Sequence, residues 1–236
     1  MPVSLQPPLD QNTGHRRLFE SHGPASNDHE RYVIKRSTTI ADESQRLNRA
    51  GTPERIVERS YSSLQNEALA IDYISIHTTV PVPKIITTYE DRGCFVIIQE
   101  YVEGAIQAYD APVHLHSTII KQLEYFVEQM RRLRSPKLQC FYPQIHLPAR
   151  LVANRIQLSH LEYPYDKDAR YVLCHGDLGW QNILVDPHTG EIKCILDWEY
   201  AGFYPAEVVG EFWKRHGTAD PLGSLDDDTE QICEFL

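Results

Sequence analysis

Two short apolar runs on either side of residue 188 predict a β-hairpin that brings two distant polar residues together. The runs 183–185 and 192–196 are rich in β-branched residues, and the segment 186–190 between them contains Pro and Gly, which favour a turn. Asn182 stands at the entry of this hairpin and Asp197 at its exit. Because hairpin strands run side by side, these two residues, fifteen positions apart, should meet at one point.

A polar loop before the hairpin carries a carboxylate that can join this pair. The run 171–174 predicts a short strand, and the loop after it holds His175, Asp177 and, five positions after that aspartate, Asn182. Phosphoryl transfer from a nucleotide needs a carboxylate to orient and deprotonate a hydroxyl, and two oxygen ligands for Mg²⁺. The pattern therefore predicts a phosphotransferase site built from Asp177, Asn182 and Asp197.

Several motifs along the chain carry a family resemblance. They are Cys-His-Gly-Asp at 174–177 with Asn182, Leu-Asp-Trp-Glu at 196–199, Ala-Gly-Phe-Tyr-Pro at 201–205, Asn-Glu-Ala at 66–68, Val-Pro-Val-Pro-Lys at 80–84 and Gln-Glu-Tyr-Val-Glu-Gly at 99–104. Together they resemble the aminoglycoside phosphotransferase and choline kinase group, small-molecule kinases with the protein-kinase fold, and its fungal members in particular. A protein-directed kinase is disfavoured, because it would carry Arg in place of Gly176, Phe-Gly after Asp197 and an Ala-Pro-Glu motif.

The resemblance implies an α+β, protein-kinase-like fold with two lobes. The N-lobe would be small and built mainly on an antiparallel sheet, and the C-lobe would be mostly helical. Asp177 would act as the catalytic base, Asn182 and Asp197 would bind the metal, and His175 would support the loop. The implied cofactors are Mg²⁺ and ATP or GTP, and the implied partner is a small molecule that offers a hydroxyl group.

The residues that hold the nucleotide phosphates are expected in the N-lobe. Lys35 is the candidate for the lysine that contacts the α- and β-phosphates, and Glu67, on a helix predicted over 63–77, is its candidate partner. Their separation leaves two explanations open: an inserted helix over 40–50, or replacement of the phosphate lysine by Arg59 in a second strand-like run. A third reading of Lys35 is a surface lysine on an edge strand.

The hinge between the lobes is expected after the last strand of the N-lobe sheet. Strands are predicted over 84–89 and 94–100 with a turn at 91–93 between them. By resemblance, the Glu100 carbonyl and the Val102 N–H group would pair with the adenine edge. The chain contains no Gly-x-Gly sequence, so no glycine-rich phosphate loop is visible.

The chain is expected to divide into three parts. Residues 1–28 contain several Pro and Gly residues among polar ones, which predicts a flexible tail. Residues 29–102 form the N-lobe with the hinge, and this lobe begins with a strand over 31–36. Residues 103–236 form the C-lobe, with the catalytic loop and an acidic C-terminal tail.

Helical periodicity is clearest in the C-lobe. Apolar residues recur at helical spacing over 117–134, which predicts the core helix of this lobe, and weaker signals predict helices over 149–162 and 207–213. The large side chains of Trp180 and Trp198 are expected to anchor the core rather than to bind substrate.

Composition excludes several classes of function. The 236-residue chain has 33 acidic against 23 basic residues and a formal net charge of -10, so nucleic-acid binding by its whole surface is not expected. Five cysteines without paired or metal-type spacing indicate a reducing compartment, with Cys174 and Cys194 expected in buried strands. No signal-peptide pattern or long apolar run occurs, which predicts a soluble, cytoplasmic protein that does not contact membranes.

Two functions from different classes follow from these observations. The first is an ATP- and Mg²⁺-dependent phosphotransferase that acts on a hydroxyl group of a small molecule. The second is a pseudokinase-like binding or regulatory module that keeps the fold with a degraded nucleotide clamp. The intact set of Asp177, Asn182 and Asp197 favours the first, and the missing glycine-rich loop favours the second.

Overall fold

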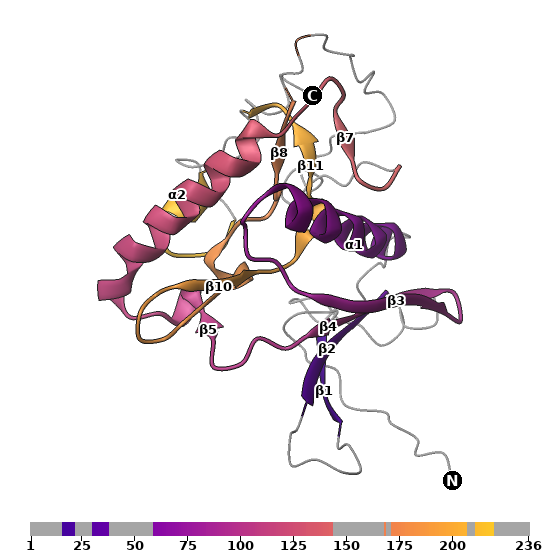
Figure 1. Ribbon diagram of the computed structural model, residues 1–236, viewed down its shortest axis with the longest axis horizontal. Helices are drawn as coiled ribbons and strands as arrows, with labels where there is room; N and C mark the ends of the chain where they lie inside the picture. Colours follow the sequence, from indigo (N-terminus) through magenta and orange to yellow (C-terminus); the bar gives the residue numbers. More distant parts are fainter. Residues whose placement is uncertain are drawn as a thin grey trace, which may run out of the picture. The chain divides into compact units, whose positions relative to one another are not determined.

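The structure, a computed structural model, describes residues 16–21, 30–37, 59–143, 168, 171–206 and 211–219. The chain forms two compact units, which are described separately below. The first consists of residues 1–64 and 84–101, and the second of residues 65–83 and 102–236. The long helix α1 (Arg59–His77) contributes residues to both units (Figure 1).

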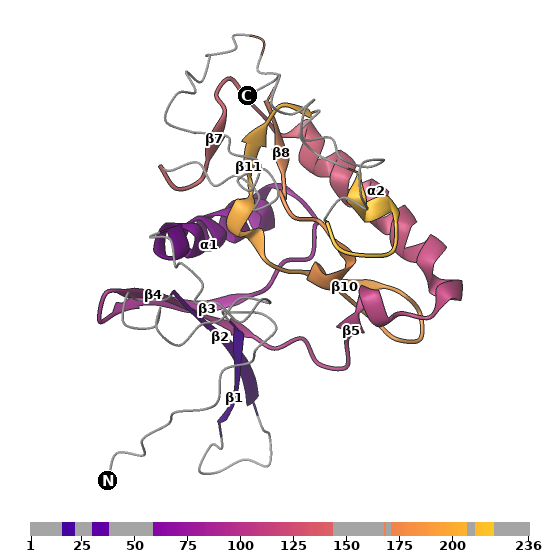
Figure 2. The ribbon, with the colours of Figure 1, turned by 180° about the vertical axis from the view of Figure 1, so that it is seen from behind.

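The first unit is built on a four-stranded antiparallel sheet (Figures 1 and 2). Its strand order is β1-β2-β4-β3, with the bounds β1 Arg16–Ser21, β2 Glu30–Arg36, β3 Ile85–Asp91 and β4 Cys94–Glu100. The strands predicted over 31–36, 84–89 and 94–100 are confirmed. The turn between β3 and β4 is confirmed as well, and its two central residues, Arg92 and Gly93, both have positive φ angles, as tight hairpin turns require.

Strand β1 departs from the sequence-based expectation. It lies within residues 1–28, for which a flexible tail is predicted, yet it pairs with β2 from Arg16 opposite Lys35 to Ser21 opposite Glu30. The prediction of a tail is therefore wrong for these six residues. The sequence of β1 has no alternation of apolar and polar residues, and the strand is stabilised by its backbone hydrogen bonds to β2.

Helix α1 begins four residues earlier than the helix predicted over 63–77 and ends at the same residue. Its buried side chains include Leu64, Ile71 and Ile74, which repeat at helical spacing. Arg59, the alternative phosphate-binding residue, is the first residue of this helix and not part of a strand. The inserted helix considered over 40–50 lies outside the described residues.

The second unit combines one long helix with two small antiparallel sheets. Helix α2 (His116–Arg132) confirms the helix predicted over 117–134, and its buried residues are Ile119, Leu123, Val127 and Met130. One sheet has the order β10-β9-β5 and the other the order β6-β8-β11-β7. The bounds are β5 Ile106–Gln107, β6 Arg134–Ser135, β7 Gln139–Cys140, β8 Tyr171–Cys174, β9 Ile183–Val185, β10 Ile192–Ile195 and β11 Gly202–Tyr204.

The described part of the second unit is less helical than the mostly helical lobe that the resemblance implies. Many of its apolar runs are three or four residues long and are bounded by Gly, Pro or Asp, which suits short strands and 3₁₀ turns. The helix predicted over 149–162 lies outside the described residues. Of the segment 207–213, residues 207–210 also lie outside, and Phe212–Lys214 forms a 3₁₀ turn.

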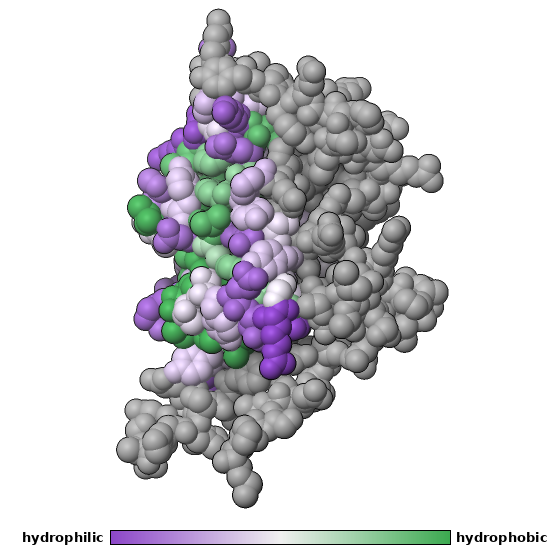
Figure 3. Space-filling model, turned by 90° about the vertical axis from the view of Figure 1, so that its right-hand side faces the viewer, coloured by the Kyte–Doolittle hydropathy of each residue, from purple (hydrophilic) through white to green (hydrophobic). Residues whose placement is uncertain are grey.

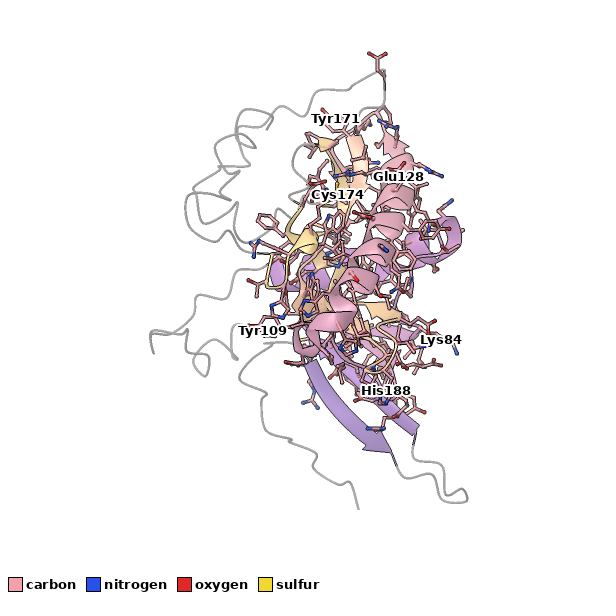
Figure 4. All side chains as sticks on the ribbon, turned by 90° about the vertical axis from the view of Figure 1, so that its left-hand side faces the viewer. Lys84, Tyr109, Glu128, Tyr171, Cys174 and His188 are labelled. Carbon is pink, nitrogen blue, oxygen red and sulfur yellow. The ribbon has the colours of Figure 1, made fainter. Side chains whose placement is uncertain are left out.

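The cysteine residues of the described segments form no disulfide bonds. Cys174 and Cys194 are buried in β8 and β10, as predicted. Figure 4 shows Tyr171 and Cys174 on β8 beside the helix that carries Glu128, which is α2. Burial raises the pKa of the Cys174 thiol, because the thiolate would be desolvated there. Cys174 is therefore a structural residue.

No helix within the described segments is both long and apolar enough to cross a membrane. The large apolar side chains that these segments expose are scattered over several elements: Leu69, Ile76, Ile86, Tyr89, Tyr109, Val113 and Tyr125. On the face shown in Figure 3, hydrophobic and hydrophilic residues are interspersed over the described part of the surface. Single exposed apolar residues of this kind are normal for globular proteins.

Candidate active site

The β9–β10 hairpin brings the two predicted metal-binding positions together along the backbone. Ile183 is paired with Ile195, and the Leu196 N–H group donates a 2.7 Å hydrogen bond to the Asn182 carbonyl. Asn182 therefore lies opposite Leu196, and Asp197 is the next residue along the chain. The prediction that the entry and the exit of the hairpin converge is confirmed.

The far end of the hairpin is held by a side-chain cap and by α2. Asp186 Oδ1 accepts hydrogen bonds of 2.9 Å from the backbone N–H groups two and three residues later, and these bonds lower the pKa of its carboxyl group. Gln122 of α2 donates a 2.8 Å hydrogen bond to the Gly190 carbonyl and accepts one from the Ile192 N–H group. The predicted turn is thereby confirmed, and the helix fixes its position.

The loop between β8 and β9 is closed by the Asn182 side chain. Asn182 Nδ2 donates two hydrogen bonds of 2.9 Å, one to the Asp177 carbonyl and one to Asp177 Oδ2. The Asn182 backbone N–H group also donates to the Gly179 carbonyl. These bonds fix the orientation of the buried amide, so its Oδ1 atom lies on the side away from Asp177.

His175 joins the loop to the residue before Asp197. Its Nδ1 atom accepts a 3.2 Å hydrogen bond from the Asp177 backbone N–H group, and its Nε2 atom lies 2.8 Å from the Leu196 carbonyl. A carbonyl can only accept, so Nε2 carries the proton and donates. The ring is thus a neutral imidazole with a defined tautomer, buried against Trp198 at 4.3 Å between ring centroids.

Gly176 allows the loop to pass directly over the turn that follows Asp197. Its φ angle is +86°, in the region that favours glycine. A Cβ atom at this position would lie 2.6 Å from Tyr200 Cβ and 2.7 Å from the Tyr200 carbonyl oxygen. A side chain cannot fit there, so the glycine between His175 and Asp177 is a steric requirement of this fold.

Asp197 has a left-handed backbone conformation, with φ +62° and ψ +60°. This region is uncommon for residues other than glycine, although aspartate and asparagine tolerate it better than most. The residue before it is held at both backbone groups, by Asn182 and by His175. Trp198–Tyr200 then form a 3₁₀ turn that leads into β11.

Both tryptophan residues of this region are core residues, as predicted. Trp180 and Trp198 are completely buried. Trp180 Nε1 donates to the Trp213 carbonyl, and Trp198 Nε1 donates to the Ile195 carbonyl. Their hydrogen bonds and burial anchor the loop between β8 and β9 and the Asp197 segment to the interior of the second unit.

Lys35 is a buried residue of an interior strand. It lies on β2, between β1 and β4, and only 2% of its surface is exposed. This burial excludes the reading of Lys35 as a surface lysine on an edge strand. Lys35 is paired with Ile97 and therefore shares a sheet face with Gln99, another buried polar residue of β4.

The candidate partner of Lys35 is buried as well. Glu67 lies on α1 with 1% of its surface exposed, and buried carboxylates of this kind need a partner. Lys35 belongs to the first unit and Glu67 to the second.

The predicted hinge follows β4. Glu100 ends this strand opposite Tyr32 of β2, and its backbone N–H group donates to the Lys84 carbonyl. Its carboxylate accepts a 2.6 Å hydrogen bond from Lys84 Nζ at the surface, which raises the pKa of Lys84. The side chain of Glu100 thus contacts Lys84, and Val102 is half-buried.

Asn66 is a site residue that sequence reasoning does not identify, although it belongs to the Asn-Glu-Ala motif. It is completely buried on α1, and its side-chain amide contacts the turn after Asp197 through the carbonyl groups of Glu199 and Ala201. The only signal in the sequence is a polar residue among the buried positions of a helix. Its partners lie more than 130 positions away, beyond the reach of local pattern reasoning.

The donor set around Asn182 suits a divalent cation that is shared with phosphate groups. No group of three or more His, Cys, Asp or Glu side chains that could hold a metal occurs in the described segments. Mg²⁺ is commonly held by one or two carboxylates together with substrate phosphates and water. An amide oxygen and a carboxylate, brought together by a hairpin, fit this mode of binding.

Comparison with known protein families supports the resemblance found in the motifs. Residues 106–208 match the model of the phosphotransferase enzyme family. This segment contains α2, the catalytic loop, the hairpin and β11. A comparison with curated proteins gives no match. The predicted family resemblance is confirmed for the matched segment.

Solved structures of aminoglycoside phosphotransferases are similar to this chain. An aminoglycoside-3'-phosphotransferase of type VIII is 15% identical, with a TM-score of 0.47 over 83% of this chain and 70% of the other. The enzyme APH(3'')-Id from Streptomyces rimosus, in complex with ADP and streptomycin, is 13% identical, with a TM-score of 0.48 over 87% and 80%. The GDP complex of aminoglycoside 2'-phosphotransferase-IIIa is 13% identical, with a TM-score of 0.47 over 83% and 71%.

Proposed function

We propose that this chain, whose residues 106–208 match the phosphotransferase enzyme family, transfers the γ-phosphoryl group of ATP to a hydroxyl group of a small molecule. The observation that carries the proposal is the bonded arrangement around Asn182. Its side chain holds the Asp177 carboxylate, and its backbone carbonyl holds the residue before Asp197. One residue thereby links the proposed base to the proposed metal ligand.

Asp177 is the proposed catalytic base. The hydrogen bond from Asn182 Nδ2 to Asp177 Oδ2 orients the carboxylate toward the acceptor hydroxyl. The hydroxyl oxygen forms the new bond to the γ-phosphorus, the bond from that phosphorus to the oxygen of ADP breaks, and the hydroxyl proton passes to Asp177. His175 keeps the loop in place as a neutral imidazole and has no part in the proton transfer.

Asn182 and Asp197 are the proposed ligands of Mg²⁺. When bound, the ion would supply charge neutralisation for the β- and γ-phosphates. The Asn182 amide is fixed with its nitrogen toward Asp177, which assigns Oδ1 to the cation. The left-handed conformation of Asp197 sets the direction in which its carboxylate leaves the backbone.

The proposed contacts to the nucleotide come from Lys35 and Glu100 of the first unit and from Glu67 and Val102 of the second. Burial of Lys35 on an interior strand supports its assignment to the α- and β-phosphates, and burial of Glu67 supports its assignment as the partner that orients the lysine. The Glu100 carbonyl and the Val102 N–H group are proposed to pair with the adenine edge. GTP is the second candidate nucleotide, and the binding test below includes both nucleotides.

A pseudokinase-like binding module is the second candidate function, favoured by the absence of any Gly-x-Gly sequence. The two candidates differ in turnover and can share nucleotide binding. A thermal-shift titration with Mg²⁺·ATP and Mg²⁺·GTP tests binding first, since a ligand specific for the native state raises its stability by mass action.

A phosphorylation screen then tests turnover. Amino alcohols, aminoglycosides and sugars are offered with ATP or GTP to the unaltered chain and to Asp177→Asn as a control. We expect at least one acceptor to be phosphorylated, and we expect the variant to lose that activity while it still binds nucleotide. Nucleotide binding without transfer to any acceptor would favour the module, and equal activity of the variant would contradict the role of Asp177.

A further inference from the structure

The Asn66 side chain uses its full hydrogen-bonding capacity on backbone groups. Nδ2 donates to the carbonyls of Glu199 at 3.0 Å and Ala201 at 2.9 Å. Oδ1 accepts from the N–H groups of Phe141 at 2.8 Å and Tyr142 at 3.0 Å. An asparagine amide can make two donations and two acceptances, so this side chain is saturated. All four partners are backbone groups of fixed polarity, so the orientation of the amide is unambiguous.

These bonds hold the segment directly after Asp197. Glu199 is in the 3₁₀ turn that follows Asp197, and Ala201 is the residue that ends it. The last carbonyl groups of a helical turn have no partner within the turn and need one elsewhere. A single buried amide supplies that partner to both carbonyls, and the other side of the amide ties them to 141–142.

Asp197 thus lies between two clamps. On one side, Leu196 is bound at its N–H group by the Asn182 carbonyl and at its carbonyl by His175. On the other side, the Asn66 amide binds the turn. A left-handed residue other than glycine persists where the surrounding structure fixes the backbone on both sides. The upstream clamp belongs to the loop between β8 and β9. The downstream clamp is the Asn66 amide, and the Tyr204 hydroxyl also donates to the Tyr200 carbonyl of this turn.

We propose that Asn66 is a positioning residue that holds Asp197 in its left-handed conformation and thereby sets the affinity of the site for a divalent cation. The proposal rests on the assignment of Asp197 as a metal ligand in the proposed function. Under this proposal a residue of α1, adjacent to Glu67 in the sequence, contributes to the geometry of the metal site. The physical reason is that a rotation of the Asp197 backbone changes the direction in which its carboxylate leaves the chain.

The test measures binding of Mn²⁺ in the presence of the nonhydrolysable nucleotide AMP-PNP, by electron paramagnetic resonance. We expect Asn66→Ala to weaken Mn²⁺ binding about 10-fold or more, the range found when residues that orient metal ligands are removed. Binding of AMP-PNP without metal should change less than the binding of Mn²⁺. If Asn66 had only a structural role, Asn66→Ala would lower the stability of the protein. It would then not weaken Mn²⁺ binding more than it weakens the binding of AMP-PNP.

Gln122→Ala is the matched control. Gln122 also uses a side-chain amide to clamp backbone groups of the same unit, Gly190 and Ile192, at the far end of the same hairpin. It should lower stability while Mn²⁺ affinity stays within about 2-fold of the unaltered chain, since distant sites act independently. Equal losses of Mn²⁺ affinity in the Asn66 and Gln122 variants would overturn the proposal.

A second variant and an NMR measurement complete the test of the positioning role. Asn66→Ser, which retains a hydroxyl donor and leaves room for a water molecule, replaces Asn66→Ala if the latter does not fold. In the unaltered chain, the Asn66 side-chain NH₂ resonances should shift when Mg²⁺·AMP-PNP is added, because the turn that they hold follows Asp197. Unchanged resonances, or normal Mn²⁺ affinity in a folded Asn66 variant, would refute the positioning role.

Asp197→Asn separates this inference from the proposed function. If the unaltered chain binds Mn²⁺ with AMP-PNP and Asp197→Asn abolishes that binding, the metal site stands, and the Asn66 result decides the inference alone. If Asp197→Asn binds Mn²⁺ as well as the unaltered chain does, the assignment of Asp197 fails, and the inference fails with it.

Discussion

The β9–β10 hairpin region of the second unit and the sheet of the first unit both bury polar side chains, but most of those in the hairpin region bond to loop backbone. In the hairpin region, Asn66, His175 and Asn182 bond to backbone groups of the loops that they hold. In the sheet, Gln99 is buried with an Oε1 atom that has no hydrogen-bond partner, and in the loop before the hairpin Gln181 Oε1 is the corresponding unbonded atom. An unsatisfied buried acceptor costs about 1–3 kcal/mol, so such groups are uncommon in folded proteins.

This difference indicates which of the two regions is stabilised by its buried polar side chains. The hairpin region is organised in advance around Asp177 and Asp197, because the Asn182 amide and the His175 imidazole tie loop backbone in place. The sheet, by contrast, buries the Gln99 side chain with an oxygen that has no hydrogen-bond partner, at a cost to its own stability. We therefore expect substitutions in the two regions to have effects of different size and, at one matched pair, of opposite sign.

The largest expected effect is on turnover in the hairpin region. Asp177→Asn removes the proposed base and should lower kcat by about 10²–10⁴-fold, the usual contribution of a positioned acid or base. The thermal midpoint of the variant should stay close to that of the unaltered chain, because the substitution keeps the size of the side chain. Steady-state kinetics with an acceptor from the screen measure the first quantity and calorimetry the second. An unchanged kcat would remove Asp177 from the mechanism.

The next effect compares two glycine residues with positive φ angles, one in each region. Gly176→Ala should destabilise the fold by roughly 3 kcal/mol or more, because its Cβ atom would meet Tyr200 in addition to the backbone strain. Gly93→Ala at the β3–β4 turn should cost only about 1 kcal/mol, since nothing lies within 4 Å of its Cβ position. Urea unfolding of both variants gives the two values. Equal costs would show that crowding at Gly176 is relieved by local movement.

A matched pair of glutamine substitutions tests the sign of the difference. Gln99→Met removes the unsatisfied acceptor of the sheet and should stabilise the protein by about 1 kcal/mol. Gln122→Met removes an amide that bonds to Gly190 and Ile192, and it should destabilise the protein by about 1 kcal/mol or more. Chemical denaturation measures both. Loss of stability in both variants would mean that Gln99 contributes more through packing than it costs through its unpaired oxygen.

The smallest effects concern pH and also differ between the regions. In the first unit, Glu100 raises the pKa of Lys84 by a hydrogen bond and by its charge, so this pair contributes stability below the unfolded pKa of Lys84 and loses it as the pH rises through the folded value. In the second unit, backbone N–H groups lower the pKa of Asp186, so its contribution is present above its unfolded pKa and is lost as the pH falls through the folded value.

These two pH dependences can be separated by variants. Lys84→Met should flatten the alkaline limb of a plot of thermal midpoint against pH, above about pH 10 where free lysine begins to titrate, and Asp186→Asn should flatten the acid limb, below about pH 4. Both groups are at the surface, so added salt should reduce the alkaline effect. A change in the opposite limb for either variant would contradict the assignment of the pKa shifts.

Local spacing explains why the hairpin region could be predicted. The strand signals at 183–185 and 192–196 and the turn between them are short-range features, and the pairing of Ile183 with Ile195 follows from them. The convergence of Asn182 with Asp197 is a geometric consequence of that pairing. Helix α2 is predictable for the same reason, because its buried residues recur at helical spacing within a short stretch of sequence.

Strand β1, the burial of Lys35 and the role of Asn66 could not be predicted in this way. β1 depends on pairing with β2, and β2 is an interior strand because β1 and β4 pair with its two edges. The burial of the Lys35 side chain depends on what packs on its face of the sheet. The partners of Asn66 come from segments 75 to 135 positions away. Each of these features depends on contacts between distant segments, which residue patterns within a short window do not encode.

The order of residues along this chain was therefore sufficient to specify the residues of the candidate site: a carboxylate, an amide and a second carboxylate at the spacing of a loop and a hairpin. Long-range packing specified how rigidly the backbone around these residues is held. The left-handed aspartate, the crowded glycine at 176 and the saturated amide of Asn66 exist only once α1, the catalytic loop and β11 are packed together. The physical reason is that a hairpin is made by neighbours in sequence, whereas a buried clamp needs partners that only folding brings within hydrogen-bond distance.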